Sequence, residues 1–204
     1  VRFISNYSSG KMGYALAESA RNLGADVELI SGPVSIKMPE NIKITSVETS
    51  AEMLDAVLGK IPYCDVFISA AAISDYRPSH KLTEKHKSSD GELVIRLERG
   101  EDILKLAKET KAGLYAVGFS AETNNISDNA KIKLEKKNID MIISNEANHQ
   151  KGLGFESDMN EVCIIEKDSM LKIPKNTKKI IADIILSRIA KNIKGNLIKI
   201  KNAR

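Results

Sequence analysis

The alternation of short apolar segments with segments of helical periodicity is what most constrains the fold of this chain. Residues 65–72 are almost wholly apolar and 114–122 largely so, which is typical of strands covered on both faces in a parallel sheet. Around them, apolar residues recur at helical spacing in 11–23, 50–60 and 125–140. This alternation predicts an α/β fold with an open, mostly parallel sheet and helices on both faces.

The remaining segments extend the same pattern. Further strands are expected at 1–6, 25–32, 43–50, 92–98, 141–146 and 161–167, and further helices at 101–110 and 176–193. We expect Ser50 to cap the helix that begins there. From Arg77 to Gly91 the only aliphatic side chain is Leu82, so 73–92 is expected to be a long polar loop.

Length and apolar content predict one soluble unit. A chain of 204 residues can bury a proper core, and we expect residues 1–204 to form a single domain. The chain opens with Val rather than Met, so we interpret it as a fragment of a longer chain. No apolar run approaches the length of a membrane span and no targeting segment is evident, so a cytoplasmic location is expected.

Charge and composition narrow the class of partner. Lys and Arg total 31 against 27 Asp and Glu, and the resulting +4 suits an anionic small molecule better than nucleic acid. Aromatic residues make up 4% with no Trp, which argues against base stacking. Cys64 and Cys163 match no metal spacing and are expected to be buried thiols in a reducing compartment. The three histidines show no zinc-ligand spacing either.

The turn 6-NYSSGKMG-13 leads from a strand into a helix. Its Ser hydroxyls and the N–H groups around Gly10 would face a helix N-terminus, which favours an anion. It is neither a dinucleotide fingerprint nor a P-loop. An ordinary Ser-capped helix with a packing glycine is an equally good interpretation.

Three other stretches carry candidate groups. In 69-SAAAISDY-76, small residues end a buried strand and Asp75 could accept from a hydroxyl or ligate Mg²⁺, or could cap a turn. The loop containing Lys85 could be a cationic lid over phosphates or a solvated loop. Lys133 and Lys137, four residues apart on one helix, could reach the sheet edge or stay solvated. Anion-binding groups without obvious acid–base residues suit chemistry at phosphorus.

Several motifs occur together in one order: VRFISNYSSGKMGYALAE, LISGP, SAAAISDYRP, EKHK, GFSAET, and K-x-x-x-K before N-x-D at 133–140. In this order and spacing the chain resembles the phosphopantothenate–cysteine ligase family of coenzyme A biosynthesis, over nearly its whole length. The resemblance implies a Rossmann-like three-layer fold and a homodimer. It also implies a flavin-dependent decarboxylase as the other half of a bifunctional protein.

The reaction implied by the resemblance has two steps. The carboxylate of 4′-phosphopantothenate attacks the α-phosphate of CTP, which releases pyrophosphate and leaves an acyl-cytidylate. The amine of L-cysteine then attacks this mixed anhydride, giving the amide and CMP. Mg²⁺ is the implied cofactor, without an assignment of its ligands.

The resemblance also implies roles for individual residues. Asn6 resembles the asparagine that holds the acyl-phosphate, with Arg2 near it, and Lys85 resembles a flap lysine that closes over the site. Ser9 and Gly10 would bind phosphate. The residues implied in nucleotide binding are Ala71, Asp75, Gly100, Glu101, Asp102, Ile103, Phe119, Lys133 and Lys137.

The chain departs from the family pattern in three places. The flap run is Lys85, His86, Lys87, Ser88 where the family commonly has K-x-K-K, and 100-GEDI-103 stands where N-P-D-I is common. The family's preceding strand and G-G-T loop are absent from the amino terminus. Two alternatives stay open: a short-chain NAD(P)-dependent oxidoreductase, which lacks support from a dinucleotide fingerprint, and a non-catalytic nucleotide-binding module.

Overall fold

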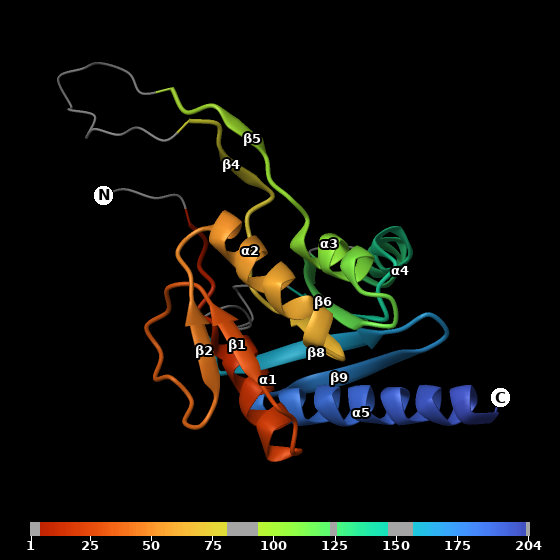
Figure 1. Ribbon diagram of the computed structural model, residues 1–204. Coiled ribbons are helices and arrows are strands. Elements are labelled where there is room, and N and C mark those ends of the chain that lie inside the picture. Colours follow the sequence, from red (N-terminus) through yellow and green to blue (C-terminus); the bar gives the residue numbers. More distant parts are fainter. Residues whose placement is uncertain (1–4, 81–93, 123–125, 147–156, 203–204) are drawn as a thin grey trace.

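A mixed five-stranded sheet forms the centre of the fold (Figure 1). The computed structural model describes residues 5–80, 94–122, 126–146 and 157–202. The strand order is β3-β6-β7-β8-β9, with bounds β3 Val66–Ser69, β6 Tyr115–Glu122, β7 Met141–Glu146, β8 Met159–Ile165 and β9 Met170–Thr177. The first three strands are parallel, and β8 and β9 are antiparallel additions at one edge.

Helices cover both faces of this sheet, as the sequence predicts. Their bounds are α1 Lys11–Asn22, α2 Ser50–Lys60, α3 Ile103–Thr110, α4 Ile126–Lys137 and α5 Lys178–Asn202, with a short 3₁₀ helix, η1, at Ile61–Tyr63. α1 and α5 pack on one face. On the other face α3 and α4 bury Leu104 and Leu134 against Ala116 of β6 and Ile142 of β7. The predicted Rossmann-like α/β fold is therefore confirmed.

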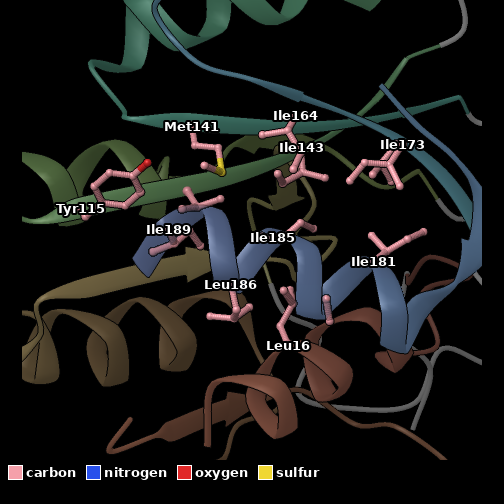
Figure 2. Close-up of a cluster of buried hydrophobic side chains, with 13 residues drawn as sticks. Leu16, Tyr115, Met141, Ile143, Ile164, Ile173, Ile181, Ile185, Leu186 and Ile189 are labelled. Atoms are coloured by element: carbon pink, nitrogen blue, oxygen red, sulfur yellow. The ribbon is translucent and has the colours of Figure 1, made fainter. Parts of the chain in front are cut away.

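The largest cluster of buried side chains lies between α5 and the sheet (Figure 2). Ile181, Ile185 and Ile189 recur every four residues, so they form one stripe that faces the strands. Leu186 points to the other side of α5, toward Leu16 of α1. Each fully buried isoleucine contributes about 1.5–3 kcal/mol relative to an exposed one, so this cluster holds both helices on the sheet.

Two small sheets accompany the main one. β1 Glu28–Ser31 pairs in parallel with β2 Lys43–Ser46, and among the described residues neither is hydrogen-bonded to the main sheet. β4 Tyr76–Pro78 and β5 Leu97–Arg99 pair antiparallel and extend away from the body as an arm (Figure 1).

The structure corrects several local predictions. β4 lies inside the segment predicted to be entirely loop, because its pairing depends on a partner strand far along the chain. The predicted strand 92–98 is described as a strand only at Leu97–Arg99, and β9 has no counterpart among the predicted strands. The cap of α2 is Thr49 rather than Ser50: the Thr49 side chain accepts from the backbone N–H of Glu52.

The cysteines are less buried than predicted. Cys64 and Cys163 are free thiols with intermediate burial. Partial burial raises the pKa of both thiols, because the protein disfavours the thiolate more than water does. In the described part of the chain, no helix is long and apolar enough to cross a membrane.

Candidate active site at the carboxyl end of the parallel strands

The turn before α1 leaves the N-terminus of that helix without a side-chain cap. Gly10 is the N-cap residue, in the left-handed conformation with φ 75°, and no side chain caps the helix with a hydrogen bond. The alternative of a Ser-capped helix is therefore wrong. The N–H groups of the first turn and the positive end of the helix dipole face the same turn as Ser9. This arrangement suits an anion.

A pocket lies beside this turn. It is lined by Ser9 and Gly10 of the turn, by Ala70 just after β3, by Asn145 of β7, and by Asn160 and Lys178. The pocket therefore draws on the carboxyl ends of two parallel strands and on the N-termini of α1 and α5. Ligands of open α/β sheets bind at such strand ends.

Asn6 lies next to the segment that follows β3. Its amide nitrogen donates to the carbonyl of Ala72, and its side-chain oxygen accepts from the backbone N–H of Ser8 at 2.8 Å. The asparagine is exposed, while both ends of its amide are engaged. The bond to Ala72 brings the motif 6–13 next to the S-A-A-A motif. The sequence predicted these two turns separately and did not indicate that they are in contact.

The acidic stretch after β5 lies against Asp75. The backbone N–H of Gly100 donates to the carbonyl of Asp75 at 2.8 Å. Asp102 caps α3 by accepting from the backbone N–H of Lys105 at 3.2 Å, and it forms an ion pair with Lys137 of α4 at 2.9 Å. Burial would raise the pKa of the Asp102 carboxyl, but the bonds from Lys137 and Lys105 lower it below its usual value. Asp102 is therefore held as a carboxylate.

Phe119 and Ser120 leave opposite faces of β6. Phe119 is partly buried on the face that α1 and α5 cover. Ser120 accepts a hydrogen bond from the ammonium group of Lys133 at 3.0 Å, which joins α4 to the end of the strand. Lys133 therefore reaches the sheet edge, as one interpretation of the sequence had it.

The other candidates divide by exposure. Ala71 and Glu101 are exposed at the same end of the sheet, whereas the side chain of Ile103 is buried, so only its backbone is accessible to a ligand. Lys131 and Lys136 are exposed, in agreement with a solvated face of α4. Arg2 and Lys85, for which the resemblance implies a place near the acyl-phosphate and a flap role, lie outside the described residues.

Sequence reasoning missed three residues of the pocket: Asn145, Asn160 and Lys178. The sequence offered one indication, at Lys178. This lysine begins α5, where the positive end of the helix dipole disfavours a cation, so a role other than helix stability could have been considered for it. The asparagines carried no comparable signal.

Comparison with known proteins agrees with this architecture. Residues 1–193 match the family described as DNA/pantothenate metabolism flavoprotein C-terminal domain. The chain belongs to this family. The family resemblance inferred from the motifs is thereby confirmed.

Two relatives of this flavoprotein C-terminal domain share one name. The coenzyme A biosynthesis bifunctional protein CoaBC of Vibrio vulnificus (strain CMCP6) is 40% identical over 192 residues, which are 93% of this chain and 48% of that protein. CoaBC of Bacillus subtilis (strain 168) is 42% identical over 192 residues, 93% of this chain and 47% of that protein. The chain thus spans about half the length of these curated relatives.

A solved structure agrees with the fold over the same extent. The crystal structure of the C-terminal domain of a CoaBC protein matches with a TM-score of 0.80 and 39% identity, covering 96% of this chain and 88% of that one. The arrangement of strands and helices that brings the motifs together is therefore that of the flavoprotein C-terminal domain.

A metal ion that binds together with a nucleotide needs few protein ligands. In the ranges that the structure describes, no three His, Cys, Asp or Glu side chains are grouped to hold a metal ion. Mg²⁺ at nucleotide sites is commonly bound by one or two carboxylates together with substrate phosphates. The exposed carboxylates of Asp75 and Glu101 fit that limited requirement.

Proposed function

We propose that this chain is a CTP-dependent ligase that joins 4′-phosphopantothenate to L-cysteine in coenzyme A biosynthesis. The observation that carries the proposal is the meeting of separate motifs at one sheet edge. Asn6 bonds to Ala72, Gly100 to Asp75, and Lys133 to Ser120. The names of the CoaBC relatives support the pathway.

The proposed reaction starts at the α-phosphate of CTP. The substrate carboxylate forms a bond to this phosphorus, and pyrophosphate leaves. The amine of cysteine then attacks the acyl carbon of the anhydride, and CMP leaves as the amide forms. Activation as an acyl-cytidylate makes the oxygen of the carboxylate a good leaving group.

Charge neutralisation is the main task of the residues around the phosphates. We assign the uncapped start of α1, with Ser9 and Gly10, and the lysines Lys133 and Lys137 to the phosphate chain. The uncapped helix end and the partly accessible ammonium groups support this assignment. Lys137 already forms an ion pair with Asp102. We therefore expect a phosphate group of the nucleotide either to contact Lys137 alongside Asp102 or to displace Asp102 from it.

The remaining roles follow the strand ends. We assign Asn6, with Arg2 near it, to the acyl-phosphate, and Phe119 to the base. Ala71, Asp75 and the segment 100–103 are assigned to other parts of the nucleotide, with Ile103 contributing through its backbone because its side chain is buried. Lys85 is proposed to close over the site, where water exclusion protects the anhydride.

Mg²⁺ bound with the nucleotide would neutralise phosphate charge. A homodimer, a cytoplasmic location and a flavin-dependent decarboxylase in the same polypeptide complete the proposal. The word "bifunctional" in the relatives' names, and their length of about twice this chain, support the last of these.

Turnover in the purified protein that contains this chain tests the proposal. Pyrophosphate release from CTP should require 4′-phosphopantothenate, and amide should form only when cysteine is added. CTP binding without release under all conditions would favour a non-catalytic nucleotide-binding module. Reduction of NAD(P)⁺ without CTP would favour an oxidoreductase. Repeating the assay with ATP determines the nucleotide preference.

A further inference from the structure

Ser144, in β7, is a buried polar side chain without a hydrogen-bond partner. It is 1% exposed, and its Oγ atom makes no hydrogen bond to any described residue. No other buried side-chain oxygen or nitrogen in the described part of the chain is left in this way. A hydroxyl buried without a partner lowers stability, and an alanine would avoid that cost. The hydroxyl of Ser144 therefore calls for a partner in another state of the protein.

The register of the sheet places Ser120 beside Ser144. The two serines are Cα partners on the parallel strands β6 and β7, so their side chains leave the same face of the sheet. This is the face that α4 covers, since Ile142, two residues before Ser144, packs with Leu134 of α4. Neighbouring strands lie about 4.8 Å apart. Rotation of the two serine side chains can therefore bring their oxygens within hydrogen-bond distance.

Ser120 is also a contact of Lys133. Its Oγ atom accepts from the Lys133 ammonium at 3.0 Å. The serine is 8% exposed, whereas the lysine side chain as a whole is exposed. Ser120 thus lies between a buried hydroxyl that lacks a partner and a lysine that we assign to the phosphate chain of the nucleotide.

A phosphate near Lys133 would change these bonds. A charge-assisted hydrogen bond is about twice as strong as a neutral one, so the ammonium group favours the phosphate over the serine hydroxyl. Ser120 then loses a donor at a place with little access to water. The hydroxyl of Ser144 can replace that donor, because it is in register and makes no other bond among the described residues.

We propose that Ser144 is a positioning residue for Lys133, which donates to Ser120 when Lys133 turns to a phosphate of the nucleotide. The unpaired hydroxyl then belongs to the ligand-free state only, so Ser144 favours the bound state without touching the ligand. This inference rests on the proposed function for the contact between Lys133 and the nucleotide.

Ser144→Ala removes the proposed donor and is tested alone and together with Ser120→Ala. Cys163→Ala is the matched control, because Cys163 is the partner of Ser144 on the other side, in β8, and has no hydroxyl. In the full protein, KM is measured separately for CTP and for 4′-phosphopantothenate. Tm is measured without ligand and with CTP alone.

We expect Ser144→Ala to raise KM for CTP about three- to tenfold, the effect of one hydrogen bond, and to reduce the Tm rise with CTP. KM for 4′-phosphopantothenate should stay within about twofold. The ligand-free Tm should not fall, because the variant removes an unpaired buried hydroxyl. In the Ser120→Ala background, Ser144→Ala should have no further effect on KM for CTP. Cys163→Ala should leave both KM values within about twofold.

An unchanged KM for CTP in Ser144→Ala would overturn the inference, and so would an equal rise in the Ser120→Ala background. Lys133→Met separates it from the proposed function. If the parent forms amide but Lys133→Met leaves KM for CTP unchanged, the ligase function stands and the role of Ser144 fails. If the parent shows no turnover, a Tm rise with CTP that Ser144→Ala reduces sustains the role of Ser144 alone. No Tm rise in such a parent overturns both.

Discussion

Gly10 and Asn6 illustrate how single residues join fold and chemistry. Gly10 has φ 75°, and a Cβ atom added there would lie 2.7 Å from Cγ1 of Val34. Only glycine meets both conditions without strain. Asn6 shows the converse case, because its side chain rather than its backbone makes the connection, through the hydrogen bond to Ala72.

Gly10→Ala should destabilise the protein by about 1–3 kcal/mol, from the left-handed backbone and the contact with Val34. Gly24→Ala has a similar φ of 86° but no atom within 4 Å of the added Cβ, so its cost should be smaller. Gly59→Ala, exposed inside α2, should stabilise by about 0.5–1 kcal/mol. Denaturant unfolding measures the free energy of unfolding of the three variants and so ranks them. Equal decreases for Gly10→Ala and Gly24→Ala would show that the contact with Val34 does not contribute.

Asn6→Asp should slow the second step of the proposed reaction by roughly 10²-fold, the size of effect seen when one donor to a developing charge is lost. The carboxylate cannot donate to an acyl-phosphate and also repels it. Single-turnover assays that follow pyrophosphate and amide separately measure the two steps. A normal amide yield would exclude Asn6 from the site.

Among helices and strands, α3 and α4 are coupled at the candidate site through one carboxylate. Asp102 caps α3 and pairs with Lys137 of α4, so it performs a local and a tertiary task together. The cap depends on a contact between Asp102 and Lys105, three residues apart, and contacts this local can be predicted from sequence. The ion pair joins segments separated by β6, and no local pattern indicated it.

Asp102→Ala should lower the free energy of unfolding by about 1 kcal/mol more than Asp102→Asn does, because asparagine still caps the helix. The difference in free energy of unfolding between Asp102→Asn and the parent should depend on pH. The lowered pKa means that the carboxylate stabilises the fold above the unfolded pKa, and this contribution disappears as pH falls through the folded pKa. Urea unfolding of both variants and the parent at neutral and acid pH checks the sign. A gap between Asp102→Asn and the parent that widens toward acid pH would contradict it.

For the molecule as a whole, α5 closes the fold over the sheet and over α1. Beyond its isoleucine stripe, Arg188 forms an ion pair with Glu166 at the end of β8, and Asn192 donates to the hydroxyl of Tyr115 at 2.8 Å. Burial raises the pKa of Tyr115 to about 12, so this hydroxyl stays protonated. Because α5 begins with Lys178, its docking also positions one wall of the pocket beside α1.

Ile185→Ala should destabilise the protein by about 2–5 kcal/mol, since Ile185 is fully buried and the change leaves a cavity. Ile180→Ala, on the same helix but 44% exposed, should change stability by no more than about 0.5 kcal/mol. Thermal and denaturant unfolding measure both. A loss in Ile185→Ala no larger than in Ile180→Ala would mean that α5 is not an integral part of the core.

The amino-acid order was enough to predict the α/β class and most helix and strand positions. These features depend on local periodicity and on motifs of neighbouring residues. The roles assigned to single residues of the candidate site stay predictions. β4 and β9 were missed because pairing with another strand stabilises them more than their own composition does. Asn160 and Lys178 were missed for a related reason: they meet Gly10 only because β8 and α5 fold back beside α1, and proximity between distant segments is a property of the folded chain.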